Sequence, residues 1–568
     1  MSTDRRNFLL AGGAAVAGLV TPNAAHADPA DDARKFIADH EARVKPLEVR
    51  AGLAWWRANI SGSEADFKLK EESQNQIDAA LSDRAAFDRL KALKTAKDAG
   101  QLSDPILARQ VTLLFLAYQE KQVAPELLRR ITNKANAVEQ QFNVFRARVD
   151  GRELPDSEVR NVLKNSADSA QRQRVWEASK QVGAVVEADL KELVALRNES
   201  ARALGFPNFH AMTLTLNEQD GAELIKLFDE LDTLTREPFT AAKTEIDDRL
   251  AKKYGVAPAA LMPWHYHDPF FQESPAVFDA NLDAPFARAD ITKLCVEFYR
   301  GIGLPVDDVI AKSDLLEKPG KSPHAFCTDI DREGDVRVLA NIQPNEYWMG
   351  TMLHELGHAV YSSKNIPNKL PYVLRAEAHI LTTEGVAMQF ERFSKSRAWL
   401  EKMGVPLGTA PNAFEDAAAR TQRNQLLIFS RWCQVMLRFE KGMYENPAQD
   451  LNKLWWDLVE RYQNLKRPMG RNAPDYASKI HICSAPVYYH NYMMGQLFAS
   501  QVHAAIARDL FKEADPKRVI YIGDRRVGEF MKDKVFAPGR TLDWKGLTRH
   551  ATGADLNPAA FARDFRPG

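Results

Sequence analysis

The pentapeptide His354-Glu355-Leu356-Gly357-His358 constrains this chain more than any other stretch. On a helix its two histidines share one face, because residues four apart stand one above the other. Two imidazoles placed in this way can bind one tetrahedral Zn²⁺ ion, and the intervening glutamate can act as base toward a water activated by the metal. The fold must therefore bring a helix to a metal site.

The flanking residues favour a partly buried helix over a surface helix with two unrelated histidines. Asn345 is a candidate N-cap, and residues 362–365 with Pro367 would end the helix. Apolar side chains recur between these ends at helical spacing: Tyr347, Met349, Met352, Leu353, Leu356, Val360 and Tyr361.

A third protein ligand is expected, because catalytic zinc usually has three protein ligands and one open position. Glu377 and Glu384 lie downstream, about two helical turns apart, and could share a helical face. Periodicity leaves the choice between them open.

Residues 1–27 are typical of an export signal. Arg5-Arg6 precedes the apolar run 8–20, and Ala25-His26-Ala27 fits a cleavage site. The arginine pair predicts the twin-arginine route, although Asp4 before it keeps the general secretory route open. We expect a periplasmic or secreted protein without stable membrane insertion, since no other segment approaches the length of an apolar span.

Charge and cysteine content narrow the function classes. The 76 basic and 76 acidic residues balance without a long basic run, so no nucleic-acid partner is expected. Four cysteines are too few and too scattered for a disulfide scaffold. A Cys327–Cys483 bridge and buried free thiols are both compatible with the sequence.

Helical periodicity dominates residues 28–261 and resumes after Glu384, which predicts a mainly α fold. Residues 262–272 interrupt it with prolines and aromatics. A packed aromatic loop is the favoured interpretation there, with ligation by His265 and His267 or a cleft wall as alternatives.

Two further stretches, one before the pentapeptide and one well after it, carry features of a substrate-binding site. Residues 324–330 and 336–342 alternate around a turn and predict a β-hairpin, whose exposed strand could pair with an extended peptide. Residues 479–492 combine a lysine, two histidines and three tyrosines. Such donors suit a terminal carboxylate and an oxyanion, although a Tyr-rich core helix is the alternative.

With these motifs the chain resembles the angiotensin-converting enzyme family of peptidyl-dipeptidases, in a bacterial, exported, single-domain form. The thimet and oligoendopeptidase families share the metal-site plan and the Pro-x-Tyr-x-x-x-Tyr pattern, which is echoed at residues 486–492. The likeness to the first family extends through most of the chain and includes residues 55–61, 196–205, His324-Ala325, the pentapeptide, 382–384, Trp455-Trp456, Tyr462-Gln463 and Lys479-x-His481.

The resemblance implies one Zn²⁺ per chain, held by His354, His358 and Glu384, since Glu384 matches the family's third ligand better than Glu377. It implies that Glu355 is the general base and then donates the proton to the leaving amine. It assigns Tyr492 to the oxyanion.

The resemblance also implies a substrate-binding set. His324 and His481 would hold substrate carbonyls, while Ala325 and Cys327 would offer strand hydrogen bonds. The C-terminal carboxylate of the substrate would be bound by Lys479, Tyr489 and Gln272, and Tyr488 competes with Tyr489 because the alignment needs an insertion after His481.

Chloride activation is not expected, because the two chloride-binding arginines of the animal enzymes align with other residues here. One position is Val459, and the other is Asn491 or His490.

The resulting expectation is an elongated, two-halved helical metallopeptidase, residues 28–568, with a deep central cleft and one small β-hairpin beside the zinc helix. An N-terminal helical lid would cover roughly 28–130, and the catalytic region roughly 260–510. We expect a monomer or weak dimer that hydrolyses oligopeptides and releases C-terminal dipeptides. The alternatives are a thimet-type oligoendopeptidase and a non-catalytic peptide-binding protein.

Overall fold

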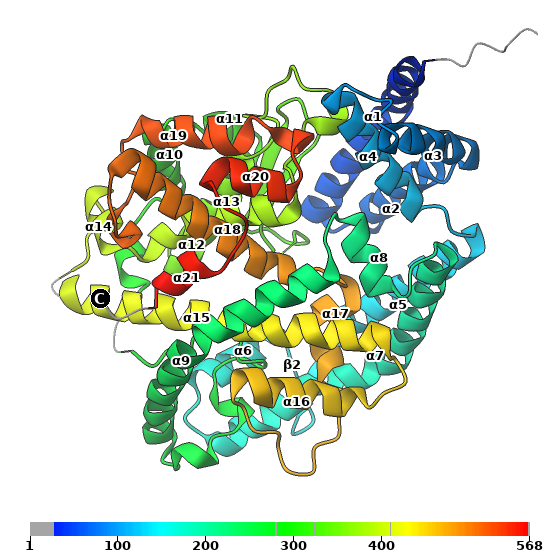
Figure 1. Cartoon of the computed structure of the whole chain (residues 1–568). Coiled ribbons are helices and arrows are strands. Elements are labelled where there is room, and N and C mark those ends of the chain that lie inside the picture. The colour runs from blue at the N-terminus through cyan, green and yellow to red at the C-terminus, as the bar shows by residue number, and fades with distance from the viewer. Residues whose placement is uncertain (1–27, 279–280, 323, 409–410, 566–568) are drawn as a thin grey trace, which may run out of the picture.

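The computed structural model describes residues 28–565 except 279–280, 323 and 409–410, so the predicted export signal, residues 1–27, lies outside the described residues. The fold is mainly helical, as predicted (Figure 1). Its α-helices are α1 Pro29–Ser61, α2 Glu64–Leu81, α3 Arg84–Asp98, α4 Pro105–Glu120, α5 Pro125–Val144, α6 Asp156–Asn165, α7 Ser169–Ala203, α8 Phe209–Leu216, α9 Gly221–Tyr254, α10 Ile291–Gly301, α11 Asp307–Lys312, α12 Glu346–Val360, α13 Ile380–Glu391, α14 Arg397–Lys402, α15 Pro411–Glu445, α16 Leu451–Gln463, α17 Ile480–Ser484, α18 His490–Ile506, α19 Arg525–Met531, α20 Trp544–Thr552 and α21 Ala559–Arg563.

In Figure 1 the helices after α4 form an upper group that includes α10–α14 and α18–α21, and a lower group that includes α6, α7, α9 and α16. The long helix α15 runs between them in this view and packs against α9, α16 and α18. One large hydrophobic core spans residues from both groups, from Val138 to Phe565.

The N-terminal helices α1, α3 and α4 have a hydrophobic cluster of their own. Phe36, Leu90 and Val111 are among its buried members, and Leu374 joins it from the catalytic region. The next helix, α5, packs against α7 instead. The predicted lid over roughly residues 28–130, both its boundary and its role, stays a prediction.

Glycines allow the helices beneath the site to approach closely. A Cβ on Gly357 of α12 would lie 2.7 Å from Ala387 Cα of α13, and a Cβ on Gly385 would lie 2.7 Å from Gly495 O of α18. Such distances leave no room for a side chain. Helix α13 is therefore fixed between α12 and α18, the two helices that carry the pentapeptide and Tyr492.

The predicted hairpin beside α12 is present. Strand β3, Phe326–Asp329, pairs antiparallel with β4, Val336–Leu339, and Cys327 lies opposite Val338. The strand is shorter than predicted, because His324 and Ala325 precede its first paired residue. A second hairpin, β1 Ala147–Val149 with β2 Arg152–Leu154, was not predicted, because its strands are too short to show alternation.

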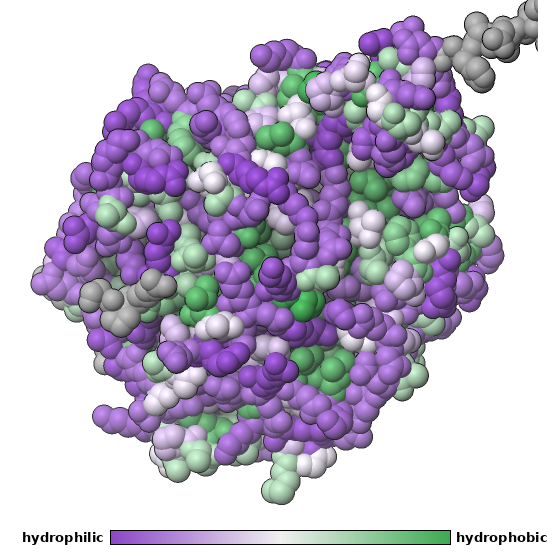
Figure 2. All heavy atoms as spheres, in the orientation of Figure 1, coloured by the Kyte–Doolittle hydropathy of each residue, from purple (hydrophilic) through white to green (hydrophobic). Residues whose placement is uncertain are grey.

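The visible surface in Figure 2 is mostly hydrophilic, with hydrophobic residues in small separate groups. Among the described residues, no helix is both long and apolar enough to cross a membrane.

Candidate active site

Helix α12 begins where predicted, because the Asn345 side chain accepts the Trp348 N–H and caps it. Its core-facing residues are buried, whereas Tyr347 in the first turn is 67% exposed and does not belong to the apolar stripe. The helix thus places His354 and His358 on one face with partial access to solvent.

His354, His358 and Glu384 bring their ligand atoms together. The two Nε2 atoms are 3.2 Å apart, and Glu384 Oε2 lies 3.6 Å from His354 Nε2 and 3.9 Å from His358 Nε2. A tetrahedral zinc site with bonds of 2.0–2.1 Å needs ligand atoms roughly 3.3–3.4 Å apart. Among the described residues, this is the one group of His, Cys, Asp and Glu that could hold a metal.

The buried carboxylate of Glu384 fits this purpose. Its Oε1 accepts a hydrogen bond from Tyr488 at 3.2 Å, whereas its Oε2 is buried without a hydrogen-bond partner. An unpaired buried carboxylate oxygen is costly unless a cation or donor meets it. The three residues therefore fit zinc.

Partners that the sequence analysis missed orient both histidines. His354 Nδ1 lies 2.8 Å from Glu391 Oε2, and His358 Nδ1 lies 2.8 Å from Thr383 Oγ1. When Nδ1 carries the proton, Nε2 keeps its lone pair for a metal. Glu391 lies about two helical turns after Glu384 on α13, a spacing that could have indicated it.

The competing ligand, Glu377, does not join this group. It precedes α13 rather than lying on it, and burial raises its pKa to about 7. The structure therefore brings Glu384, and not Glu377, to the histidines.

Glu355 lies on the same helix and is 8% exposed. Burial raises its pKa to about 7, against the opposing effects of His354 and of a hydrogen bond from the Cys327 backbone. A carboxyl with a pKa near neutrality can both accept and donate a proton.

An aromatic cluster adjoins the metal ligands through Tyr488. The ring of Tyr492 lies 5.2 Å from Tyr488, 5.3 Å from Tyr489 and 6.3 Å from His481, measured between centroids. Burial, with a contribution from Lys479 and His324, lowers the pKa of His481 to about 3. His481 is therefore neutral at pH 7 and lies near His324, which is exposed.

Lys479 and Gln272 meet at the other side of this cluster. Lys479 Nζ donates to Gln272 Oε1 at 2.6 Å, and the same ammonium lies 5.5 Å from the centre of the Tyr489 ring. Burial lowers the pKa of Lys479 to about 8. The structure thus brings together three residues that the family resemblance assigned to the C-terminal carboxylate of the substrate.

The aromatic loop holds Gln272 in place. Asp268 accepts backbone N–H groups from Phe270, Gln272 and Glu273 at 2.8–3.2 Å. The ring nitrogens of His265 and His267 are engaged within the protein, with Ser169 and Met262 for the first and with Tyr254 and Ala276 for the second. The packed-loop interpretation is confirmed.

The predictions for the cysteines and for the chloride-binding positions concern residues outside this cluster. All four cysteines are free thiols, so the alternative of a Cys327–Cys483 bridge was wrong. At the expected chloride positions Val459 is buried, and Gln219 is hydrogen-bonded to His490 and Asn491, each at 2.8 Å.

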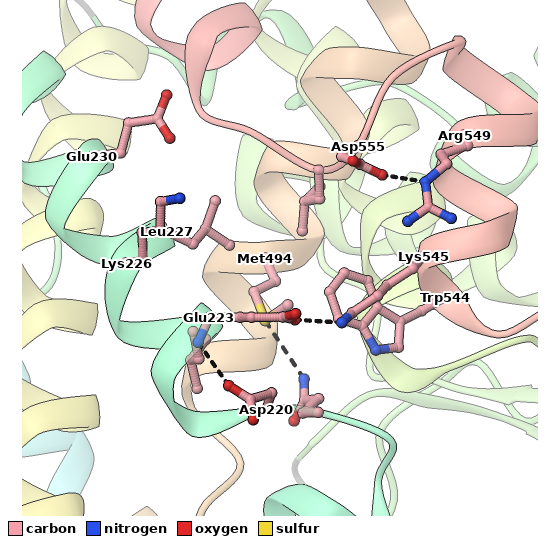
Figure 3. A pocket seen from close by; sticks show the side chains of 13 residues that line it. Asp220, Glu223, Lys226, Leu227, Glu230, Met494, Trp544, Lys545, Arg549 and Asp555 are labelled. Atoms are coloured by element: carbon pink, nitrogen blue, oxygen red, sulfur yellow. Dashed lines mark hydrogen bonds and ion pairs between the residues drawn. The ribbon is translucent and has the colours of Figure 1, made fainter.

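A cavity of about 310 Å³ lies between α9, α18 and α20 (Figure 3). Its wall contains Met494 of α18 and Trp544, and ion pairs Glu223–Lys545 and Asp555–Arg549 border it. None of the three metal-ligand candidates lines it.

Comparison with known proteins gives the same family as the motifs. A family profile described as angiotensin-converting enzyme, Peptidase_M2, matches residues 27–567. Angiotensin-converting enzyme of Rattus norvegicus is 23% identical over 446 residues, covering 72% of this chain and 33% of the rat protein. That of Bos taurus is 21% identical over 583 residues, covering 95% of this chain and 43% of the bovine protein.

An angiotensin-converting enzyme-related protein of Drosophila melanogaster is 22% identical over 262 residues, covering 43% of this chain and 40% of that protein. The matches thus span less than half the length of these relatives. Because the family profile covers nearly the whole chain, the protein belongs to the angiotensin-converting enzyme family of metallopeptidases.

Proposed function

We propose that the protein is a zinc-dependent peptidyl-dipeptidase that releases dipeptides from the free C-terminus of oligopeptides. The observation that carries the proposal is the hydrogen bond of 2.6 Å between buried Lys479 and half-buried Gln272, which the tyrosine cluster connects to the candidate metal ligands. A buried ammonium beside an amide suits a terminal carboxylate, and holding that carboxylate in one place relative to the candidate metal ligands would select which peptide bond is cut.

The residues around the site then have distinct roles. His354, His358 and Glu384 would hold the Zn²⁺ ion, which would supply a Lewis acid toward water and the scissile carbonyl. Glu355 takes the proton of the attacking water and delivers it to the leaving amine. Tyr492 donates its hydroxyl to the developing oxyanion.

Substrate binding involves both sides of the cluster. Neutral His481, together with His324, donates to substrate carbonyls and holds the chain extended. Lys479, Gln272 and Tyr489 bind the terminal carboxylate. Ala325 precedes β3, where its backbone can pair with the substrate.

The family match favours this prediction over a thimet-type oligoendopeptidase. The complete set of ligand residues, with Glu355 beside them on α12, favours catalysis over peptide binding alone.

The test uses one N-terminally blocked nonapeptide, supplied as free acid and as C-terminal amide, with and without a chelator. Successive loss of two residues from the free acid alone, abolished by the chelator, supports the proposal. Internal cuts in both forms would indicate an oligoendopeptidase. Absence of chelator-sensitive cleavage would leave only a binding protein.

A further inference from the structure

The turn between α17 and α18 holds Val487 in the left-handed backbone region, with φ of 56°. β-Branched residues avoid this region, because their Cβ substituents clash with the backbone. The side chain is 4% exposed, so it is packed in the core. A conformation of this kind persists only where the surrounding structure enforces it, and such residues cluster at functional sites.

Glu440 of α15 contacts the backbone of this turn. Its Oε1 accepts the Val487 N–H at 2.8 Å, and the residue is 2% exposed. Burial raises the pKa of Glu440 to about 8, so its carboxyl is mostly neutral at pH 7. A neutral carboxyl that accepts one hydrogen bond can be replaced by an amide with little change.

The turn sets the direction of the next side chain. Tyr488 follows Val487 and donates its hydroxyl to Glu384 Oε1. This bond occupies one carboxylate oxygen, and the buried Oε2 remains for the metal. The same ring packs against Tyr492.

We propose that Glu440 is a positioning residue: by holding Val487 in its strained conformation, it directs Tyr488 onto Glu384 and thereby fixes which oxygen of Glu384 faces the metal. The proposal rests on the function proposed above, because it takes Glu384 as a ligand. Its effect falls on metal binding and turnover rather than on carboxylate binding by Lys479.

The test compares Glu440→Leu with Glu440→Gln. The zinc affinity of the metal-free protein is measured by competition with a chromophoric chelator. The constants kcat and KM are measured with the free-acid peptide, and folding is checked by thermal unfolding. Glu440→Leu should weaken zinc binding about 10- to 100-fold, as loss of outer contacts to metal ligands does. It should lower kcat and leave KM nearly unchanged, whereas Glu440→Gln should match wild type.

Two further variants separate positioning from a structural role. Val487→Gly in the Glu440→Leu background should recover zinc affinity, because glycine adopts positive φ without a clash. Tyr488→Phe should weaken zinc binding without changing the turn. Glu445→Leu, at the exposed end of the same helix, is the matched control.

Normal zinc affinity in folded Glu440→Leu overturns the proposal. So does a loss of zinc affinity in Glu440→Gln as large as that in Glu440→Leu. Failure of Val487→Gly to restore zinc binding in the Glu440→Leu background also overturns it. If Glu440→Leu does not fold, Tyr488→Phe decides, and its normal zinc affinity overturns the proposal. A wild-type protein that binds no zinc would instead refute the proposed function.

Discussion

His354 Nδ1 lies 2.8 Å from Oε2 of Glu391, the last residue of α13. The same helix therefore provides both a candidate metal ligand, Glu384, and the carboxylate that orients a second candidate ligand, His354. Because α13 is packed between α12 and α18 through glycines, this relationship is fixed by backbone contacts rather than by flexible side chains alone.

Glu391→Ala should weaken zinc binding by about 10- to 100-fold, because His354 loses the partner that sets its tautomer and ring orientation. Chelator competition on the metal-free protein measures this. Glu401→Ala, which removes a half-exposed carboxylate from α14, serves as control. Equal zinc affinities of both variants would contradict the role of Glu391.

Glu384→Ala should abolish stoichiometric zinc binding, whereas Glu377→Ala should retain it. The reason is that Glu384 Oε2 lies within 4 Å of both histidine Nε2 atoms, and Glu377 lies outside this group. Metal content after dialysis distinguishes the pair. Zinc retained by the first variant and lost by the second would reverse the ligand assignment.

Local patterns predicted much of this site. The N-cap at Asn345 and the four-residue spacing of the two histidines predicted the helix that carries the pentapeptide. Alternation of side chains predicted the hairpin next to it. The resemblance predicted that Lys479 and Gln272 would meet, although they are far apart in the chain.

Other features depend on contacts that sequence periodicity does not encode. Glu440 lies on α15, whereas Val487 lies in the turn between α17 and α18. A valine at positive φ also contradicts the backbone preference of this residue type. Neither the sequence pattern nor residue propensity therefore indicates the hydrogen bond between them. The packing of α5 on α7 likewise depends on contacts between helices that periodicity alone does not specify.

Glu355→Gln should keep zinc and lose most turnover, on the order of 10²–10⁴-fold, because an amide cannot take a proton from water. The similar size of the two side chains preserves the helix and its histidines. Metal content and kcat are measured on the same preparation. Near-normal turnover with bound zinc would exclude Glu355 as the base.

Tyr492→Phe should lower kcat roughly 10²–10³-fold, as expected for one lost oxyanion donor, with a smaller change in KM. Burial raises the pKa of Tyr492, so its hydroxyl remains protonated and able to donate at neutral pH. Tyr347→Phe is a control at an exposed position. A change confined to KM would assign Tyr492 to ground-state binding instead.

Lys479 should impose an alkaline limit on hydrolysis of free-acid peptides. Its pKa is lowered by burial to about 8, so the free enzyme loses this positive charge as pH rises through that value. Because kcat/KM reports ionisations of the free enzyme, it should fall above about pH 8 for the free acid. Any residual cleavage of the C-terminal amide should lack this decline, since the amide offers no carboxylate for the ammonium.

Lys479→Met should remove the alkaline decline and lower kcat/KM for the free acid by about 30-fold or more, the cost expected when one partner of a buried charge pair is truncated. The pH profile of kcat/KM is measured for both proteins and both substrates. An alkaline decline that persists unchanged in Lys479→Met, or that is equal for acid and amide, would show that another group titrates. In that case the carboxylate would be bound without the charge of Lys479.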